Sequence, residues 1–167
     1  MKITSKNANK LLKQLNEEHS SLLNMEEQSS TFLAAVGEDV ESVRPAYDYE
    51  DIQNRLTELE LKIIRLKHAI NLFNTSTRID EFDMNIDELL VYIPQLTARK
   101  NKLEKMKNSL SKQRVESYNR SNIIDYRYIN YDLDKVKEDY RKTVDELNRA
   151  QVALDEANVN QSFDIEL

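Results

Sequence analysis

Hydrophobic residues recur along one stretch of the chain in alternating steps of three and four. This spacing is typical of a coiled-coil seam, because it keeps one face of a helix turned toward a partner. At about 1.5 Å per residue, the helix would be roughly 37 Å long. We therefore expect a long central helix that partner helices cover along its whole length. The residues of this seam are Tyr49, Ile52, Leu56, Leu59, Ile63, Leu66, Ile70 and Phe73.

Three further stretches repeat hydrophobic residues at helical spacing. One begins near Ser5 and carries a stripe of leucines as far as residue 23. Another begins at Asn85, with Glu88 placed to complete a capping box, and runs to Leu110 through Pro94. The last follows Asp132, a good N-cap residue. The sequence therefore predicts about four long helices.

Two stretches have the pattern of strands instead. Residues 123–131 are dense in tyrosine and isoleucine, and the tail at 159–167 alternates polar residues with Phe163, Ile165 and Leu167. An isolated pair of strands is marginal in water. We therefore expect these strands to pair with each other or with a neighbouring subunit, and the tail to be the exchange element of an oligomer.

Glycine and proline are scarce, with one glycine and two prolines in 167 residues. Tight turns depend on these residues, so few turns and long elements are expected. Residues 38–48 form an acidic connector with a helix-breaking Pro45, and residues 111–122 read as a polar loop. The expected architecture is mainly α: a single domain over 1–167, an antiparallel bundle or coiled coil with a small two-stranded β element.

The chain is acidic, with a formal net charge of −6, and contains no cysteine. Acidity disfavours attraction of the whole surface to nucleic acid or anionic lipid. No disulfide or thiolate zinc site is possible without cysteine. The chain begins with a polar amphipathic stretch, and no window approaches an 18-residue apolar span, so we expect a cytoplasmic protein with no membrane partner.

Residues that could support catalysis or metal binding do not form a known motif. His19 and His68 are the two histidines, and positions 16 and 65, where a Glu-x-x-His motif would need glutamate, hold Asn16 and Arg65. One glycine cannot build a phosphate loop or a dinucleotide fingerprint. We therefore expect a protein that is not an enzyme and that has no metal or cofactor site.

Several segments resemble a family of small uncharacterised helical proteins from bacteria and mobile elements, some of which are labelled septicolysin. The resemblance rests on LKHAINLFNTST at 66–77, IDELLVYIPQL at 86–96, YRYINYD at 126–132, and ALDEAN at 153–158 with FDI at 163–165. It implies a helical, oligomeric fold, a glycine-containing turn before the helix at 85–110, and a septicolysin-like toxin as one possible activity. Residues 79–84 contain no glycine, so the turn departs from the family pattern.

The central helix also carries apolar residues beside its seam, at Leu61, Ile64, Ala69 and Leu72. This is more apolar perimeter than one antiparallel neighbour covers. We therefore expect a homo-oligomeric coiled-coil interaction or scaffold protein, whose other partner would be a protein. The polar end of the helix, Asn71 and residues 74–77, terminates it or lines a small polar pocket or an oligomer axis.

A run of basic residues from Arg99 to Arg114, followed by several tyrosines, supports an alternative function. Basic side chains with interleaved aromatic rings can grip phosphates and stack on unpaired bases. The run can equally pair with the acidic residues of 38–60, if the helices at 49–73 and 85–110 pack antiparallel. A nucleic-acid-binding module at residues 99–131 therefore remains open. Arg99 and Lys112 belong to the run, and the candidate contacts are Lys100, Lys102, Lys105, Lys107, Arg114, Arg120, Arg127 and Tyr128.

Overall fold

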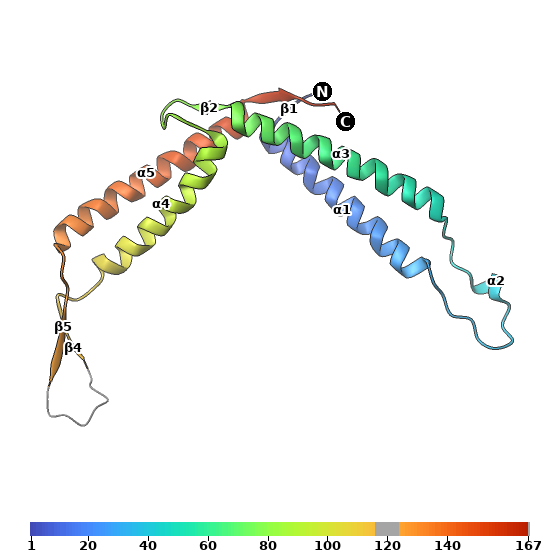
Figure 1. Ribbon diagram of the computed structural model, residues 1–167, viewed down its shortest axis with the longest axis horizontal. Helices are drawn as coiled ribbons and strands as arrows, with labels where there is room; N and C mark the ends of the chain where they lie inside the picture. The colour runs from blue at the N-terminus through green and yellow to red at the C-terminus, as the bar shows by residue number, and fades with distance from the viewer. Residues whose placement is uncertain (116–123, 167) are drawn as a thin grey trace. The chain divides into compact units, whose positions relative to one another are not determined.

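The structure is a computed structural model that describes residues 1–115 and 124–166 (Figure 1). Its helices are long and its strands are short antiparallel pairs, which confirms the mainly α fold class with a small β component. In chain order the elements are β1 (Lys2–Thr4), α1 (Ser5–Ser29), α2 (Val40–Val43), α3 (Tyr49–Ser76), β2 (Arg78–Ile79), β3 (Met84–Asn85), α4 (Ile86–Lys107), β4 (Lys112–Val115), β5 (Asp125–Tyr128), α5 (Leu133–Asn160) and β6 (Ser162–Asp164).

The chain forms two compact units where the sequence predicted one domain. Unit 1 holds Met1–Thr77 together with Glu156–Leu167, and unit 2 holds Arg78–Asp155. The division follows the helix partners, because α1 and α3 share a hydrophobic core within unit 1. Each unit is described by itself below.

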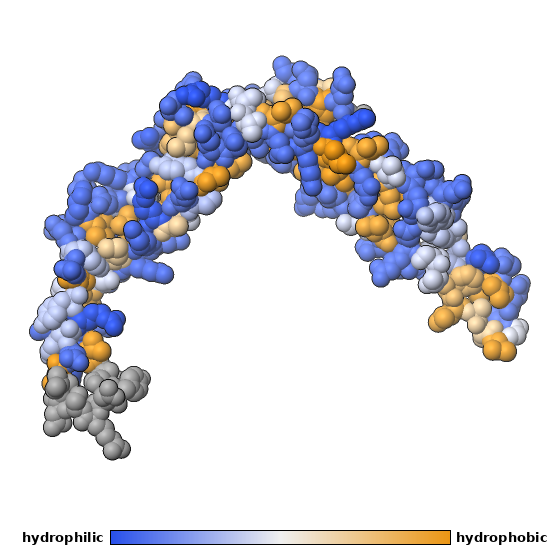
Figure 2. Space-filling view, viewed as in Figure 1, coloured by the Kyte–Doolittle hydropathy of each residue, from blue (hydrophilic) through white to orange (hydrophobic). Residues whose placement is uncertain are grey.

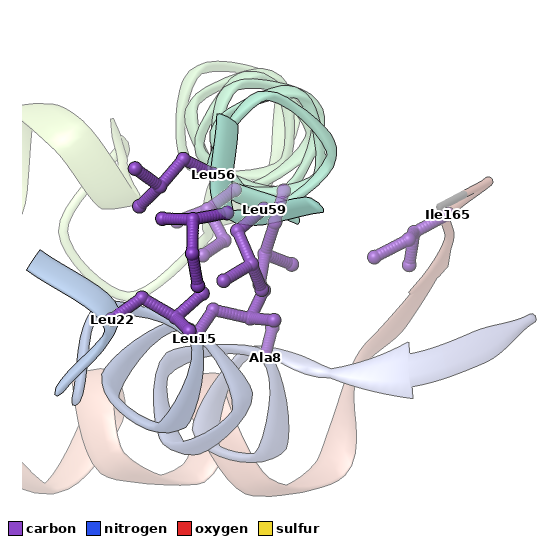
Figure 3. Packing of buried hydrophobic residues seen from close by; sticks show 9 residues of the cluster. Ala8, Leu15, Leu22, Leu56, Leu59 and Ile165 are labelled. Carbon is purple, nitrogen blue, oxygen red and sulfur yellow. The ribbon is translucent and has the colours of Figure 1, made fainter. Parts of the chain in front are cut away.

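The core of unit 1 lies between α1 and α3, which run side by side. Ala8, Leu15 and Leu22 of α1 recur every seven residues and face the seam of α3 (Figure 3). This spacing matches the heptad repeat of a coiled coil. Six seam residues are buried and one is half-buried, as the pattern predicted: Ile52, Leu56, Leu59, Leu66, Ile70 and Phe73, with Ile63.

One expectation about this helix is wrong. Tyr49 is 62% exposed, because it is the first residue of α3 and lies outside the packed part of the seam. Within unit 1 the helix packs on α1. The connector before α3 contacts α1, where the Tyr47 hydroxyl donates a hydrogen bond to Glu26 at 2.8 Å.

The C-terminal tail pairs with the N-terminal strand of the same chain. β6 pairs antiparallel with β1, with Phe163 opposite Ile3, and Ile165 is buried in the core of unit 1. The Phe163 ring packs on Phe73 of α3 at 4.9 Å between centroids. The prediction that the tail pairs with the strand at 123–131 is therefore wrong, because the short strand β1 was not recognised. Exchange of the tail between subunits stays a prediction. Leu167 lies outside the described residues.

Unit 2 is built on α4 and α5. The capping box of α4 is present, since the Asn85 N–H donates to Glu88 at 2.8 Å, and Asp132 caps α5 by accepting from the Asp134 N–H at 2.8 Å. Tyr92 of α4 donates to Glu146 of α5 at 2.5 Å. Both helices bury apolar residues, among them Leu89, Leu96 and Leu103 of α4 and Val136, Leu147 and Ala150 of α5.

A tight β-hairpin without glycine precedes α4. β2 and β3 form the hairpin, and Asp83 has a φ of 55°. Aspartate tolerates this left-handed conformation better than most residues. Arg78 forms an ion pair with Asp83, and Arg149 of α5 pairs with Glu81 at 2.8 Å. These contacts hold a turn that has no glycine.

Residues 111–122 are not simply a loop. Lys112–Val115 form β4, which pairs antiparallel with β5 in the predicted strand region, and the pair forms a two-stranded ribbon. Three of the four residues of β4 are polar, so the segment lacks the alternation of polar and apolar residues that predicts a strand. The strand could therefore not be recognised in the sequence. The Tyr131 hydroxyl donates to the Met106 carbonyl at 2.8 Å and anchors the base of the ribbon to α4.

The bond between Tyr92 and Glu146 leads to a prediction on stability. The hydrogen bond that the Tyr92 hydroxyl donates to Glu146 raises its pKa, and burial of the hydroxyl raises the pKa further. The stabilisation is therefore complete below the ordinary tyrosine pKa of about 10 and is lost as pH rises through the raised pKa. We expect Tyr92→Phe to lower the free energy of unfolding by about 1 kcal/mol at neutral pH. Urea denaturation between neutral and alkaline pH checks this, and a difference from wild type that does not shrink above the raised pKa would contradict it.

Candidate functional site

Unit 1 has a groove between the second half of α3 and the tail strand β6. Its volume is about 780 Å³. The apolar part of its lining comes from Leu72, Phe73 and Phe163. On the side of the tail it is lined by Ser162 and Asp164. Hydrophobic atoms interrupt the charged surface of this unit in the space-filling view (Figure 2). We call this concave surface the α3–β6 groove.

An exposed stripe on α3 leads into this groove. Leu61, Ile64 and Leu72 are all exposed, as the sequence predicted, whereas Ala69 is half-buried. At about 100° per residue these three residues lie on the side of the helix opposite the seam that faces α1. We call them the α3 stripe. The helix therefore has one apolar face that is packed within the chain and a second that is open.

Charged residues of both signs line the same groove. Arg65 and His68 project from α3, and Asp164 and Glu166 belong to the tail. Within residues 1–115 and 124–166, none of the four has an ion pair. The groove thus offers a basic wall and an acidic wall, neither of which has an ion pair in the described chain.

The polar end of α3 both terminates the helix and borders the groove. The Ser76 hydroxyl donates to the Leu72 carbonyl at 2.7 Å, and the Thr75 hydroxyl donates to the Asn71 carbonyl at 3.0 Å. Such side-chain bonds to backbone carbonyls are common where helices end. Ser76 and Thr77 also line the α3–β6 groove.

The β4–β5 ribbon presents a second candidate surface in unit 2. Residues directly opposite in an antiparallel ladder project to the same face. Lys112 lies opposite Tyr128, and Arg114 lies opposite Tyr126, so all four share one face. Gln113, Val115, Asp125 and Arg127 occupy the other face. We call the face that carries Lys112, Arg114, Tyr126 and Tyr128 the basic-aromatic face. The predicted contact Arg120 and its neighbour Tyr118 lie outside the described residues.

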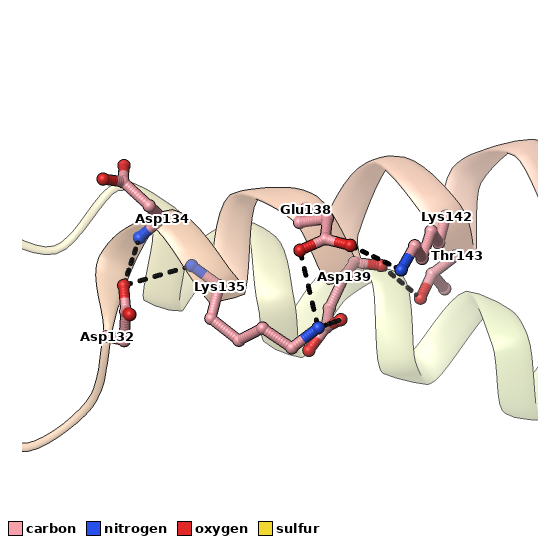
Figure 4. A network of polar contacts seen from close by, with 7 residues as sticks. All are labelled: Asp132, Asp134, Lys135, Glu138, Asp139, Lys142 and Thr143. Atoms are coloured by element: carbon pink, nitrogen blue, oxygen red, sulfur yellow. Dashed lines mark hydrogen bonds and ion pairs between the residues drawn. The ribbon is translucent and has the colours of Figure 1, made fainter.

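The basic residues of α4 and β4 differ from those of α5 in their partners. On α5, Lys135 lies 3.1 Å from Asp139 and Lys142 lies 2.5 Å from Glu138 (Figure 4). None of the seven basic side chains between Arg99 and Arg114 forms an ion pair with a described residue of unit 2. The predicted pairing of this run with the acidic block at 38–60 would join unit 2 to unit 1 and stays a prediction. Within unit 1, Lys62 pairs locally with Glu58.

Neither histidine belongs to a metal site in the described part of the chain. His19 lies 3.2 Å from Glu60, across the interface of α1 and α3, and His68 lines the α3–β6 groove. Among residues 1–115 and 124–166, no three histidine or acidic side chains cluster in a way that could hold a metal ion. None of the described helices is both long enough and apolar enough to span a membrane.

Comparisons with known proteins give a fold relationship and no function. No family model and no curated protein matches the chain. A crystal structure of a functionally unknown conserved protein from Corynebacterium diphtheriae is similar, with a TM-score of 0.64 and 18% sequence identity over 98% of this chain and 100% of that chain. At this identity the likeness supports the fold alone. The resemblance to septicolysin-labelled proteins stays a prediction.

Proposed function

We propose that this chain is a non-enzymatic coiled-coil interaction protein that assembles with copies of itself through the α3 stripe and the α3–β6 groove. The observation that carries the proposal is the second apolar face of α3. A long helix with two apolar faces is typical of assemblies, because a face left in water exposes hydrophobic area that a partner can bury. The proposed partner is a second copy of this chain.

The charges of the groove favour a second copy over an unrelated protein. An interface with two-fold symmetry uses the same patch on both subunits, so the patch must be complementary to itself. A surface that places Arg65 and His68 beside Asp164 and Glu166 meets this condition. In a symmetric pair, the basic wall of one copy, with the Arg65 guanidinium, faces the acidic wall of the other, which fixes the orientation.

The free edge of β6 adds a second self-complementary feature. Met1 and Ile165 exchange backbone hydrogen bonds at 2.7 and 2.9 Å, so Ser162 and Asp164 direct their backbone groups away from β1. In the described chain, the sheet contains β1 and β6 and no third strand. An open strand edge is a template for pairing, and two identical edges related by a two-fold axis can pair antiparallel.

The prediction for this proposal uses exposed positions, so that folding is not disturbed. We expect Ile64→Lys combined with Leu72→Lys to convert a defined multimer into a monomer of 19.6 kDa, because two charges would be buried at the interface. Light scattering coupled to size exclusion measures the mass. Circular dichroism confirms that the helices are retained.

The matched control is Val91→Lys on α4. Val91 is 61% exposed, the same fraction as Ile64, so a nonspecific effect of adding lysine at an apolar surface position would appear equally in both. We expect the control to keep the mass of the wild type. A wild-type chain that is monomeric at high micromolar concentration, or a double variant with unchanged mass, would refute the proposal.

Deletion of the tail is a less informative test than these point variants. Phe163 packs on Phe73, and Ile165 belongs to the core of unit 1. Removal of residues 159–167 would therefore disturb the fold as well as any interface. A change of mass after such a deletion could not be assigned to lost subunit contacts alone.

A further inference from the structure

We propose that the basic-aromatic face of the β4–β5 ribbon binds single-stranded nucleic acid. The site consists of Lys112, Arg114, Tyr126 and Tyr128, with the basic end of α4 beside it in sequence. This activity does not depend on self-assembly, because all of these residues belong to unit 2, whereas the α3 stripe belongs to unit 1.

The arrangement of cations and rings on the ribbon carries the proposal. Strand pairing brings two cationic and two aromatic side chains to one face and sends the one acidic residue of the ribbon, Asp125, to the other. Both tyrosines are exposed, and their ring centroids lie 6.4 Å apart. Exposed rings beside cations form the platform on which unpaired bases stack while phosphates meet the charges.

The ribbon has no core of its own. Seven of its eight strand residues are exposed, and Val115 is half-buried. A two-stranded ribbon without a packed face is marginal in water. The Lys112 ammonium lies over these rings, 4.1 Å from the Tyr126 centroid and 5.6 Å from that of Tyr128. A phosphate would draw this ammonium from the rings and leave their faces open to bases.

The charge around the ribbon favours a polyanion, although the whole chain is acidic. Residues 99–115 and 124–128 contain eight basic and two acidic side chains. The basic residues of this run on α4 and β4 have no ion pair with a described residue of unit 2. An acidic peptide would satisfy these charges, but it would leave the two exposed rings without a stacking partner.

Fluorescence anisotropy with labelled oligo(dT) and oligo(U) of about 12 nucleotides tests the proposal at about 50 mM salt. We expect Arg114→Gln to weaken binding about tenfold and to lower the slope of log affinity against log salt by about 0.7, the effect of one lost phosphate contact on a single strand. We expect Tyr126→Ala to weaken binding by roughly 5- to 150-fold, and Tyr126→Phe to retain wild-type affinity because the ring remains.

Arg127→Gln is the matched control. It removes the same charge from the same ribbon but from the opposite face, so affinity should stay at the wild-type value. Equal losses with Arg114→Gln and Arg127→Gln would overturn the proposal, as would equal losses with Tyr126→Ala and Tyr126→Phe. Absence of binding at about 50 mM salt would overturn it too. So would a polyglutamate peptide that competes as well as an oligonucleotide of equal charge, because the face would then recognise charge without bases.

Discussion

We expect Leu66→Ala to lower the free energy of unfolding by about 2–5 kcal/mol, which is a large fraction of the stability of a domain. Leu66 is 0% exposed and lies in the middle of the seam between α3 and α1. Truncation removes buried methyl and methylene groups and leaves a cavity that a pair of long helices can only partly close. Urea denaturation followed by circular dichroism measures the loss.

Leu61→Ala is the control for this prediction. It makes the same chemical change five residues earlier on the same helix, where the side chain is 49% exposed and belongs to the α3 stripe. We expect a change within about 0.5 kcal/mol for the monomeric chain. Similar losses at the two positions would show that the seam is not the face that packs on α1.

The second large effect is expected at the tail. Ile165 is 4% exposed, and it joins the core of unit 1 at the end of the β1–β6 pair. We expect Ile165→Ala to cost about 2–5 kcal/mol, within the range for truncation of a buried isoleucine. Faster hydrogen exchange at the Ile3 and Phe163 amides should accompany the loss, because β6 would no longer be held against β1.

Asp164→Ala is the control for the tail, and we expect a change within about 0.5 kcal/mol because Asp164 is exposed. Both variants should be measured in the Ile64→Lys/Leu72→Lys background, where assembly should not contribute. Since β6 pairs with β1 of its own chain, the loss should be the same across about a hundredfold range of protein concentration. A loss that grows on dilution would instead show that β6 is exchanged between copies.

The candidate surfaces could be found in the sequence only in part. The sequence already showed Leu61, Ile64 and Leu72 as apolar residues outside the seam, and in the structure they are exposed on the opposite side of the helix. The groove could not be predicted, because its second wall is the tail and the tail is placed by the unrecognised strand β1. Likewise, the basic run was visible, but its sharing of one face with Tyr126 and Tyr128 follows from strand register.

The sequence by itself determined the long helices and their caps. The periodicity of α3, the capping box at Asn85 and the cap at Asp132 act within a few residues, and such short-range signals are independent of what lies far along the chain. The scarcity of glycine and proline predicted long elements for the same local reason.

Only the tertiary structure decided which elements pair. A heptad seam specifies that a partner helix exists but not which one, since leucines on α1 and α4 would satisfy α3 almost equally. Short strands are weaker still, because a strand of three or four residues gains its stability from the neighbour that it meets. The pairing of α3 with α1, of β6 with β1 and of β4 with β5 therefore depends on long-range packing, and so does every surface on which the proposed functions rest.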